Sequence, residues 1–397
     1  MTHLTRRSPG LRAAPILLAA AMAAAACAPG PEARWHAPAS PGPSGPATTQ
    51  TKAEPTTLTI VGSGDVLLHP QLWNQAHADA KAKGEDGYDF TPLFEDVRDV
   101  VSSADLAICH IEPPLAAADG PFIGFPRFSV PPQVAPALAD LGYDACSTAS
   151  NHTIDQGEAG VVRTLDALDA AGIKHAGSYR TKADHGMVTM LEIQGVKIAS
   201  LSYAFSFNGL RRPAGKEWIA NQIDTADILA EAKRARAEGA EIVVVSLHFG
   251  TEYQHAANSQ QLSVAKKLLS SPDVDLILGH HAHVVQPFEK IGDKWVAYGM
   301  GNEVAHHAEP SNDNREGVLA RFTFTEVSPG AWKVTTAEAI PIWMDFSPDR
   351  LINIPDALAD PATSSTDRSV LKGALMRIKG YLISRGADDD GLVVDGA

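Results

Sequence analysis

The sequence predicts an α/β fold in which two sheets pack together and helices cover the outside. Over the first half of the chain, short apolar runs alternate with helical patterns, which is typical of a largely parallel sheet. A hairpin follows at Gln194-Gly195, where the two strands have to be antiparallel. Further apolar runs continue towards the C-terminus, and the total is enough for two sheets.

Each strand is expected where apolar and β-branched residues follow one another, and each helix where apolar residues recur every third or fourth position. The expected strands are Leu58–Val66, Asp105–Ile111, Tyr143–Thr148, Met187–Ile193, Val196–Tyr203, Glu241–His248, Asp275–Leu278, Val284–Ile291, Trp295–Tyr298 and Gly317–Phe324. The expected helices are Pro92–Ser103, Gln133–Leu141, Glu158–Ala171, Thr225–Glu238 and Ser259–Ser270.

The N-terminus carries the pattern of an export signal. Arg6, Arg7 and Arg12 precede a small, apolar stretch that closes on Cys27 and is too short to span a bilayer as a mature helix. The junction before Cys27 is similar to a bacterial lipoprotein cleavage site, so residues 1–27 are expected to be a signal that leaves an acylated Cys27 on a membrane anchor. The alternative is ordinary signal cleavage and a secreted product.

Composition divides the rest of the chain. Residues 28–55 are dense in Pro, Ala, Ser, Gly and Thr and predict a disordered tether. Residues 56–345 are expected to form the α/β domain, and residues 346–397 a partly helical C-terminal extension.

Charge and cysteine content limit the partners and the redox chemistry. The net charge of −14 argues against a nucleic-acid partner, because phosphate backbones are held mainly by clustered Lys and Arg. Beyond Cys27 only Cys109 and Cys146 remain, each in an expected core strand. Two buried free thiols are expected in preference to a disulfide.

Six polar residues end expected strands or directly follow them. Because α/β sheets bind ligands beyond the carboxyl ends of their strands, these side chains are expected to converge at one edge. They are Asp65, Glu112, Asn151, His248, His281 and His283.

The strongest local signal is His281-Ala282-His283, which offers two imidazoles for first-row metals on one loop. Each of the others has a plain structural alternative. His248 follows apolar residues and would serve as a core imidazole, and Asn151-His152 would form a helix-entry turn. The carboxylates are more telling, since a buried one is costly unless it is paired or coordinated.

The order of these residues resembles a known family. The segments GSGDVLL, IEPP, STASNHTIDQG, LHFGTEY, GHHAHVVQP and YGMGN are similar to motifs of the CapA family of poly-γ-glutamate capsule proteins, within the calcineurin-like metallophosphatase superfamily. The resemblance covers roughly Leu58 to Phe324. It implies a metallophosphatase-like two-sheet sandwich flanked by helices, a four-layer αββα fold.

The resemblance also implies roles for individual residues. One or two divalent cations (Mn, Fe or Zn) would activate a water molecule, and His152 would act as general acid. The implied ligands are Glu112 as a bridge, Asn151, His248 and His281 around one cation, and Asp65 and His283 around the other.

Several positions depart from the family pattern. The usual Asp-x-His is Asp65-Val66-Leu67 here, His110 replaces an Asn, and Glu303 replaces an aromatic residue. These departures leave one cation position short of ligands. The secondary candidates for the site are His69, Glu252 and Asn302, whereas His306-His307 is interpreted as part of a loop.

The expected function is capsule polymer biosynthesis or processing at the cell surface, as a metal-dependent hydrolase of a phosphoester or of the anionic polymer. The alternative is a non-catalytic, membrane-anchored accessory subunit of a polymer synthase or exporter. A carbohydrate hydrolase using Asp65 and Glu112 is a third hypothesis, but it leaves the histidines unexplained.

Overall fold

The computed structural model describes residues 56–307 and 311–397. The signal, Cys27 and the tether therefore lie outside the described residues. The described residues belong to one compact unit, which contains both sheets and the C-terminal region.

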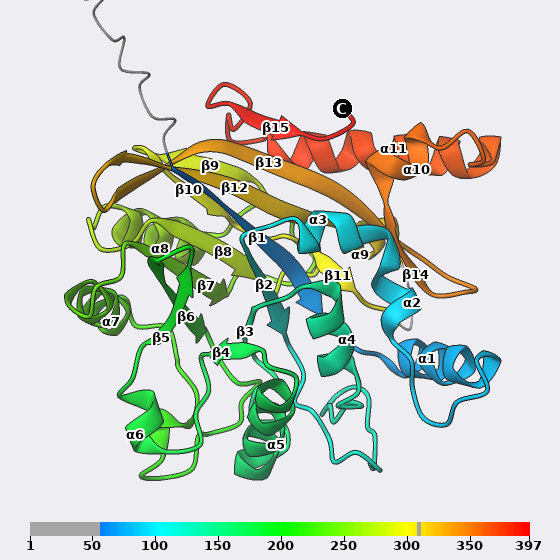
Figure 1. Ribbon diagram of the computed structural model, residues 1–397, viewed down its shortest axis with the longest axis horizontal. Coiled ribbons are helices and arrows are strands. Elements are labelled where there is room, and N and C mark those ends of the chain that lie inside the picture. The colour runs from blue at the N-terminus through cyan, green and yellow to red at the C-terminus, as the bar shows by residue number, and fades with distance from the viewer. Residues whose placement is uncertain (1–55, 308–310) are drawn as a thin grey trace, which may run out of the picture. The chain divides into compact units, whose positions relative to one another are not determined.

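The larger sheet has a parallel half and an antiparallel half (Figure 1). Its strand order is β14-β13-β12-β1-β2-β3-β4, with β11 paired to β1 and β15 paired to β13. The parallel strands are β1 (Thr57–Val66), β2 (Leu106–Ile111), β3 (Ala145–Ser147) and β4 (Lys174–Ala176). The antiparallel strands are β12 (Glu316–Ser328), β13 (Ala331–Asp345) and β14 (Arg350–Asn353), while β11 (Asn302–Val304) pairs parallel to β1 and β15 (Leu392–Val394) pairs parallel to β13.

The smaller sheet has the order β5-β6-β7-β8-β10-β9. Its strands are β5 (Thr189–Ile193), β6 (Val196–Ala204), β7 (Ile242–His248), β8 (Leu276–His280), β9 (Phe288–Ile291) and β10 (Lys294–Ala297). The run β6-β7-β8-β10 is parallel, and β5 and β9 pair antiparallel at the two edges.

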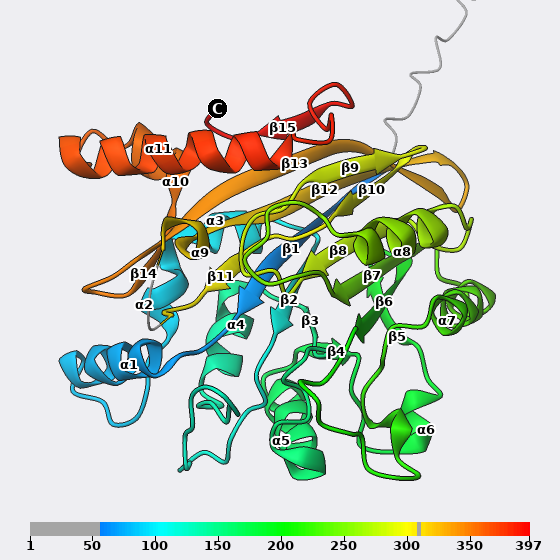
Figure 2. The same cartoon turned by 180° about the vertical axis from the view of Figure 1, so that it is seen from behind.

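Helices cover the outer faces of both sheets (Figures 1 and 2). The outer face of the larger sheet packs against α1 (Pro70–Ala82), α2 (Thr91–Phe94), α3 (Arg98–Ser102), α4 (Val134–Leu141) and α5 (Gly157–Ala170). The outer face of the smaller sheet packs against α7 (Thr225–Ala237) and α8 (Ser259–Leu269). The short helices are α6 (Lys182–His185), α9 (Asn312–Arg315) and α10 (Ile354–Ala359).

The core between the sheets follows from strand alternation. Ile108 of β2 faces the smaller sheet, while its neighbours Ala107 and Cys109 pack under the outer helices. The long C-terminal helix α11 (Ser365–Leu382) adds side chains such as Ile378 to the same inter-sheet core. The two-sheet α/β architecture predicted from the sequence is confirmed.

Some elements differ from expectation. The predicted helix Pro92–Ser103 is broken into α2, a 3₁₀ turn at Glu95–Val97 and α3. The run Val284–Ile291 becomes a strand only from Phe288, because the preceding residues form the loop that carries His283. Residues 346–397 contribute two strands to the larger sheet as well as α10 and α11.

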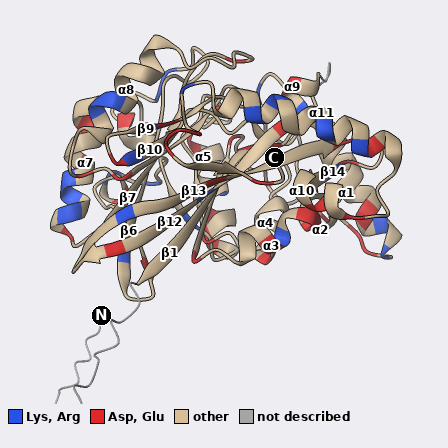
Figure 3. Ribbon diagram, turned by 90° about the horizontal axis from the view of Figure 1, so that it is seen from above, with Lys and Arg blue, Asp and Glu red and all other residues tan. Residues whose placement is uncertain are grey.

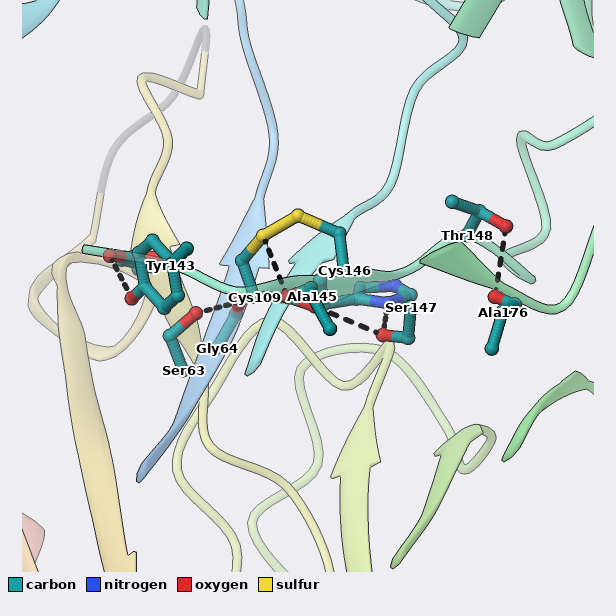
Figure 4. Close-up of a disulfide and its surroundings, with 11 residues drawn as sticks. Ser63, Gly64, Cys109, Tyr143, Ala145, Cys146, Ser147, Thr148 and Ala176 are labelled. Carbon is teal, nitrogen blue, oxygen red and sulfur yellow. Dashed lines mark hydrogen bonds between the residues drawn. A yellow bond between two sulfur atoms is a disulfide. The ribbon is translucent and has the colours of Figure 1, made fainter. Parts of the chain in front are cut away.

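The prediction of two free thiols is wrong. Cys109 and Cys146 form a disulfide between the neighbouring strands β2 and β3 (Figure 4). The two residues are directly opposite each other in the parallel register, with Cα atoms 4.4 Å apart and side chains on the same face. The composition favoured buried thiols, but only the register brings the two sulfurs together.

Gly279 in β8 is expected to be intolerant of any side chain. A Cβ atom there would lie 2.0 Å from the backbone oxygen of Tyr298. We expect Gly279→Ala to lower the free energy of unfolding by about 3 kcal/mol, the scale of severe overpacking, in chemical denaturation. Gly380→Ala on α11, where a Cβ meets nothing within 4 Å, is the control and should cost nothing. Equal stability of the two variants would contradict this packing argument.

Candidate metal centre

Four polar side chains meet where the carboxyl ends of two sheets face each other. Asp65 of β1 pairs in register with His110 of β2, and His248 of β7 pairs in register with His280 of β8. All four residues are buried, and none is more than 2 % exposed to solvent. The strand ends therefore convert an apolar inter-sheet core into a polar centre.

The loop after β8 adds two more histidines in strained backbone. His281 and His283 have φ values of 91° and 55°, which side-chain-bearing residues rarely adopt. Each such residue costs on the order of 1–3 kcal/mol and tends to occur at functional sites. The N–H of His281 donates to Asp65 Oδ2 at 3.2 Å, which ties the loop to β1.

Asp65, Glu112 and His283 form the centre's charged group. His283 Nδ1 lies 3.0 Å from Asp65 Oδ2, and His283 Nε2 lies 3.7 Å from Glu112 Oε1. Burial alone would lower the pKa of His283, but Glu112 and Asp65 raise it to about 10. An imidazolium thus neutralises two buried carboxylates when nothing else does.

Glu112 is a carboxylate of the centre that lacks hydrogen-bond partners. Both of its carboxylate oxygens are buried without a hydrogen-bond partner. Burial raises the pKa of Glu112 to about 7, because a bare carboxylate is poorly solvated there. Two unpartnered oxygens in a buried site are what a cation would satisfy.

His248 and Asn151 lie against the His281 ring. His248 Nε2 lies 3.0 Å from Asn151 Oδ1, and the ring centroids of His248 and His281 are 4.7 Å apart. Burial lowers the pKa of His281 to about 3 and holds the pKa of His248 well below its usual value. Both rings are therefore neutral, the form in which histidine binds metals.

His152 lies beside the centre and is held in one orientation. Its Nδ1 lies 2.6 Å from Asp155 Oδ2, and its Nε2 faces Asn208 Nδ2 at 3.4 Å. The ring meets Phe128 edge-on at 4.8 Å between centroids. With Nδ1–H donated to Asp155, Nε2 is the nitrogen left to exchange a proton.

The three secondary candidates surround His283. Asn302 Oδ1 lies 3.0 Å from His283 Nδ1, a contact that orients the ring. Glu252 is exposed, with a carboxylate oxygen within 4.8 Å of nitrogens of His281 and His283. His69 is buried, and its Nδ1 accepts the His306 N–H at 3.3 Å; burial lowers its pKa to about 4.

Sequence reasoning missed three histidines at the centre. His110 and His280 stack with ring centroids 4.0 Å apart, and His110 Nε2 lies 2.9 Å from His248 Nδ1. His307, interpreted as a loop residue, does lie on a loop, but its ring centroid is 5.6 Å from that of His283. Strand alternation could have found His110, because it lies two residues after inward-facing Ile108.

The donor set fits a divalent first-row cation. Carboxylates and neutral imidazoles together suit Mn, Fe or Zn. Three groups each have ligand atoms within 4.8 Å of one another: Asp65, Glu112 and His283; Glu252, His281 and His283; and Asp65, His110 and His280. The structure brings all six predicted ligands into this region, and their roles as ligands stay predictions.

Glu303 of β11 is buried and accepts a hydrogen bond from Tyr143 Oη at 2.7 Å. Burial raises its pKa from 4.5 to about 7. Because folding raises this pKa, ionisation destabilises the folded state: the cost is absent below pH 4.5 and complete above about pH 7.

Glu303→Gln keeps the accepting oxygen and cannot ionise. We expect the wild-type chain to lose about 3 kcal/mol of stability relative to this variant as pH rises from about 4.5 to about 7. Urea denaturation of both proteins across this range measures the difference. Parallel stability curves would show that Glu303 does not titrate as its burial implies.

Comparisons with known proteins identify the family of this chain. The family described as "Bacterial capsule synthesis protein PGA_cap" matches residues 59–307. The capsule biosynthesis protein CapA of Bacillus anthracis is 28% identical over 45% of this chain and 44% of its own length. A probable polyglutamine synthesis accessory protein of Mycobacterium tuberculosis is 25% identical over 61% of this chain and 66% of its own length. The chain spans about half the length of the Bacillus relatives it matches.

Two solved structures to which this chain is similar are a phosphatase and a phosphoesterase. A phosphatase of Mycoplasma pneumoniae has 14% sequence identity and a TM-score of 0.45, covering 73% of this chain and 95% of its own. A calcineurin-like phosphoesterase of Bacillus subtilis has 14% identity and a TM-score of 0.42, covering 82% of this chain and 97% of its own.

Proposed function

This chain belongs to the bacterial capsule synthesis protein family PGA_cap, and we propose that it acts in the synthesis or processing of a poly-γ-glutamate-type capsule polymer as a metal-dependent hydrolase. The relatives from Bacillus are named capsule biosynthesis protein CapA and PGA biosynthesis protein CapA, which supports the polymer class. A phosphoester is the other substrate class that such a centre suits.

One observation carries the catalytic proposal: the carboxylate of Glu112 is buried with both oxygens unpartnered, and its Oε1 lies 3.7 Å from His283 Nε2. A structural core would not leave a carboxylate in this state, because its desolvation has to be offset by a partner. A divalent cation is the partner that the surrounding imidazoles also suit.

Glu112, Asp65, His281 and His283 would hold the cation, and Asn151 and His248 lie close enough to contribute. Bound there, a cation supplies Lewis acidity and lowers the pKa of a bound water molecule. Loading would also remove the need for His283 to carry a proton between the two carboxylates.

His152 supplies the proton transfer in this proposal. Asp155 fixes the ring through Nδ1, and the loop is held in place because Ser150 Oγ donates to the backbone oxygen of Glu112 at 2.6 Å. The Nε2 atom faces Asn208 at the rim, where the leaving group of a substrate would need a proton.

The charge distribution of the chain suits an anionic polymer only at the centre. Figure 3 shows Lys and Arg spread over α7, α8 and α11, with Asp and Glu among them. For a chain with net charge −14, bound cations would supply the positive charge that draws carboxylates to the centre.

The accessory-subunit hypothesis is the second candidate. It is favoured by Leu67, which stands where the family resemblance implies a ligand histidine, and by the accessory role in the name of the Mycobacterium relative. In this reading the centre binds a cation for structure, and the synthase performs the chemistry.

The test is a metal analysis of the purified chain together with hydrolysis assays on a phosphodiester and on poly-γ-glutamate. We expect bound Mn, Fe or Zn, and hydrolysis of one substrate that is lost on chelation and restored by adding the metal back. Bound metal without hydrolysis of either substrate would favour the accessory subunit. Absence of any bound metal would overturn the metal-dependent proposal.

We also propose that the chain is exported and held at the membrane by acylated Cys27. No described helix has the length and apolar composition that a membrane crossing requires. Because the acyl chains on Cys27 would provide the anchor in this proposal, Cys27→Ala should shift the protein from the detergent phase to the aqueous phase on Triton X-114 partitioning. Equal partitioning of both proteins would leave plain secretion as the better account.

A further inference from the structure

The inner side of the centre holds two histidines, His110 and His280, that the proposed hydrolase does not use. Asp65 Oδ1 lies 3.5 Å from His280 Nδ1 and 4.0 Å from His110 Nε2, whereas Asp65 Oδ2 faces His283. The two carboxylate oxygens thus point to two different groups of nitrogens. Asp65, His110 and His280 form the inner group, and one ligand atom of each lies within 4.8 Å of those of the other two.

His280 is the unexplained residue of this group. Its ring is 2 % exposed, and neither Nδ1 nor Nε2 has a hydrogen-bond partner. The 3.5 Å contact with Asp65 is too long to satisfy Nδ1 as a hydrogen bond. A buried imidazole without a partner for either nitrogen is costly and calls for a ligand.

His110 and His248 have their outer nitrogens satisfied and their inner nitrogens facing each other. His110 Nδ1 can donate to Ser147 Oγ at 2.7 Å, and that hydroxyl can donate onward to the backbone oxygen of Cys109 at 3.3 Å. His248 Nε2 can donate to Asn151 Oδ1 at 3.0 Å. The inner nitrogens, His110 Nε2 and His248 Nδ1, then present two lone pairs 2.9 Å apart.

A cation between these atoms would remove that repulsion and satisfy His280 as well. The separations among Asp65 Oδ1, His110 Nε2, His248 Nδ1 and His280 Nδ1 that are given above, 2.9 to 4.0 Å, resemble those between ligands of one tetrahedral ion. One carboxylate and three imidazoles suit Zn²⁺ or Co²⁺.

We propose that Asp65, His110 and His280, with His248 beside them, form a second, inner cation site. It is separate from the outer site of Glu112, His281 and His283 and joined to it by Asp65. The inference rests on the proposed function at one point only, because both sites use the carboxylate of Asp65. The inner ion has no exposed donor around it, so it orders the strand ends, while the outer site meets substrate.

The experiment counts cations bound to the purified full-length chain after chelation and reloading with Co²⁺, using elemental analysis and visible absorption. We expect His280→Ala and His110→Gln each to bind one Co²⁺ fewer per chain than the wild type. His281→Ala should lose the other ion and keep the inner one. His175→Ala, a half-buried histidine of β4 outside the centre, is the control and should bind as the wild type does.

His110→Gln guards against a variant that fails to fold, because its amide can still bond Ser147, and circular dichroism checks both proteins. Unchanged Co²⁺ binding in both folded variants would overturn the inner site while leaving the proposed function intact. Loss of one ion in His280→Ala but not in His281→Ala would support the inner site and contradict the outer one. A wild-type chain that binds no Co²⁺, Zn²⁺ or Mn²⁺ would overturn both.

Discussion

Replacing His152 by Ala should lower turnover by about two to four orders of magnitude while leaving the bound cation nearly unchanged. The reason is the position of the ring: Nδ1 is committed to Asp155, and the rim nitrogen Nε2 faces Asn208 rather than the carboxylates. A proton donor and a ligand fail differently when removed, so metal content and kcat should separate. Elemental analysis and steady-state kinetics on one preparation measure both.

Asp155→Asn is the matched variant for His152. Asp155 also accepts the Phe128 N–H at 2.8 Å, so its amide should keep the loop in place while allowing the imidazole to turn or change tautomer. We expect a smaller loss of kcat than in His152→Ala, with an altered pH profile. If His152→Ala loses the cation instead, His152 is a ligand and the general-acid assignment is wrong.

The parts of the fold that the sequence predicted are those with a strong local pattern. The strands Leu58–Val66 and Glu241–His248 and the helix Thr225–Glu238 correspond closely to β1, β7 and α7. Long-range pairing carries no such local mark. The disulfide depends on β2 and β3 being neighbours in one register, and β11 exists because residues after Met300 return to pair with β1.

The candidate site followed the same division. Residues that end apolar strands, such as Asp65 and His248, could be identified because a polar side chain there breaks the pattern. His280 also ends an apolar strand, two positions after inward-facing Leu278. It was not identified because it directly precedes the more conspicuous His281-Ala282-His283 motif. His307 could not be predicted, because only the path of its loop brings it near His283.

Asp65→Asn should have the largest effect of any single change, because this carboxylate serves both groups of donors. It contacts His283 and His280 and accepts the backbone N–H of His281, so the isosteric amide removes a charge from the whole centre. Burial opposes its ionisation, yet contacts with His280 and His283 hold the pKa of Asp65 well below its usual range, so the charge is present at neutral pH.

We expect Asp65→Asn to weaken cation binding by more than about 100-fold, since loss of an outer-shell partner alone costs about 10–100-fold. Hydrolysis should fall with it, because both cation positions lose a ligand at once. Titration of the chelated protein with Co²⁺ gives the affinity. Asp144→Asn is the control: that carboxylate accepts the Ala107 N–H at the opposite end of β2, away from the centre, and should leave Co²⁺ binding unchanged. Wild-type Co²⁺ affinity in Asp65→Asn would mean that the carboxylate is an orienting group for His283 and not a ligand.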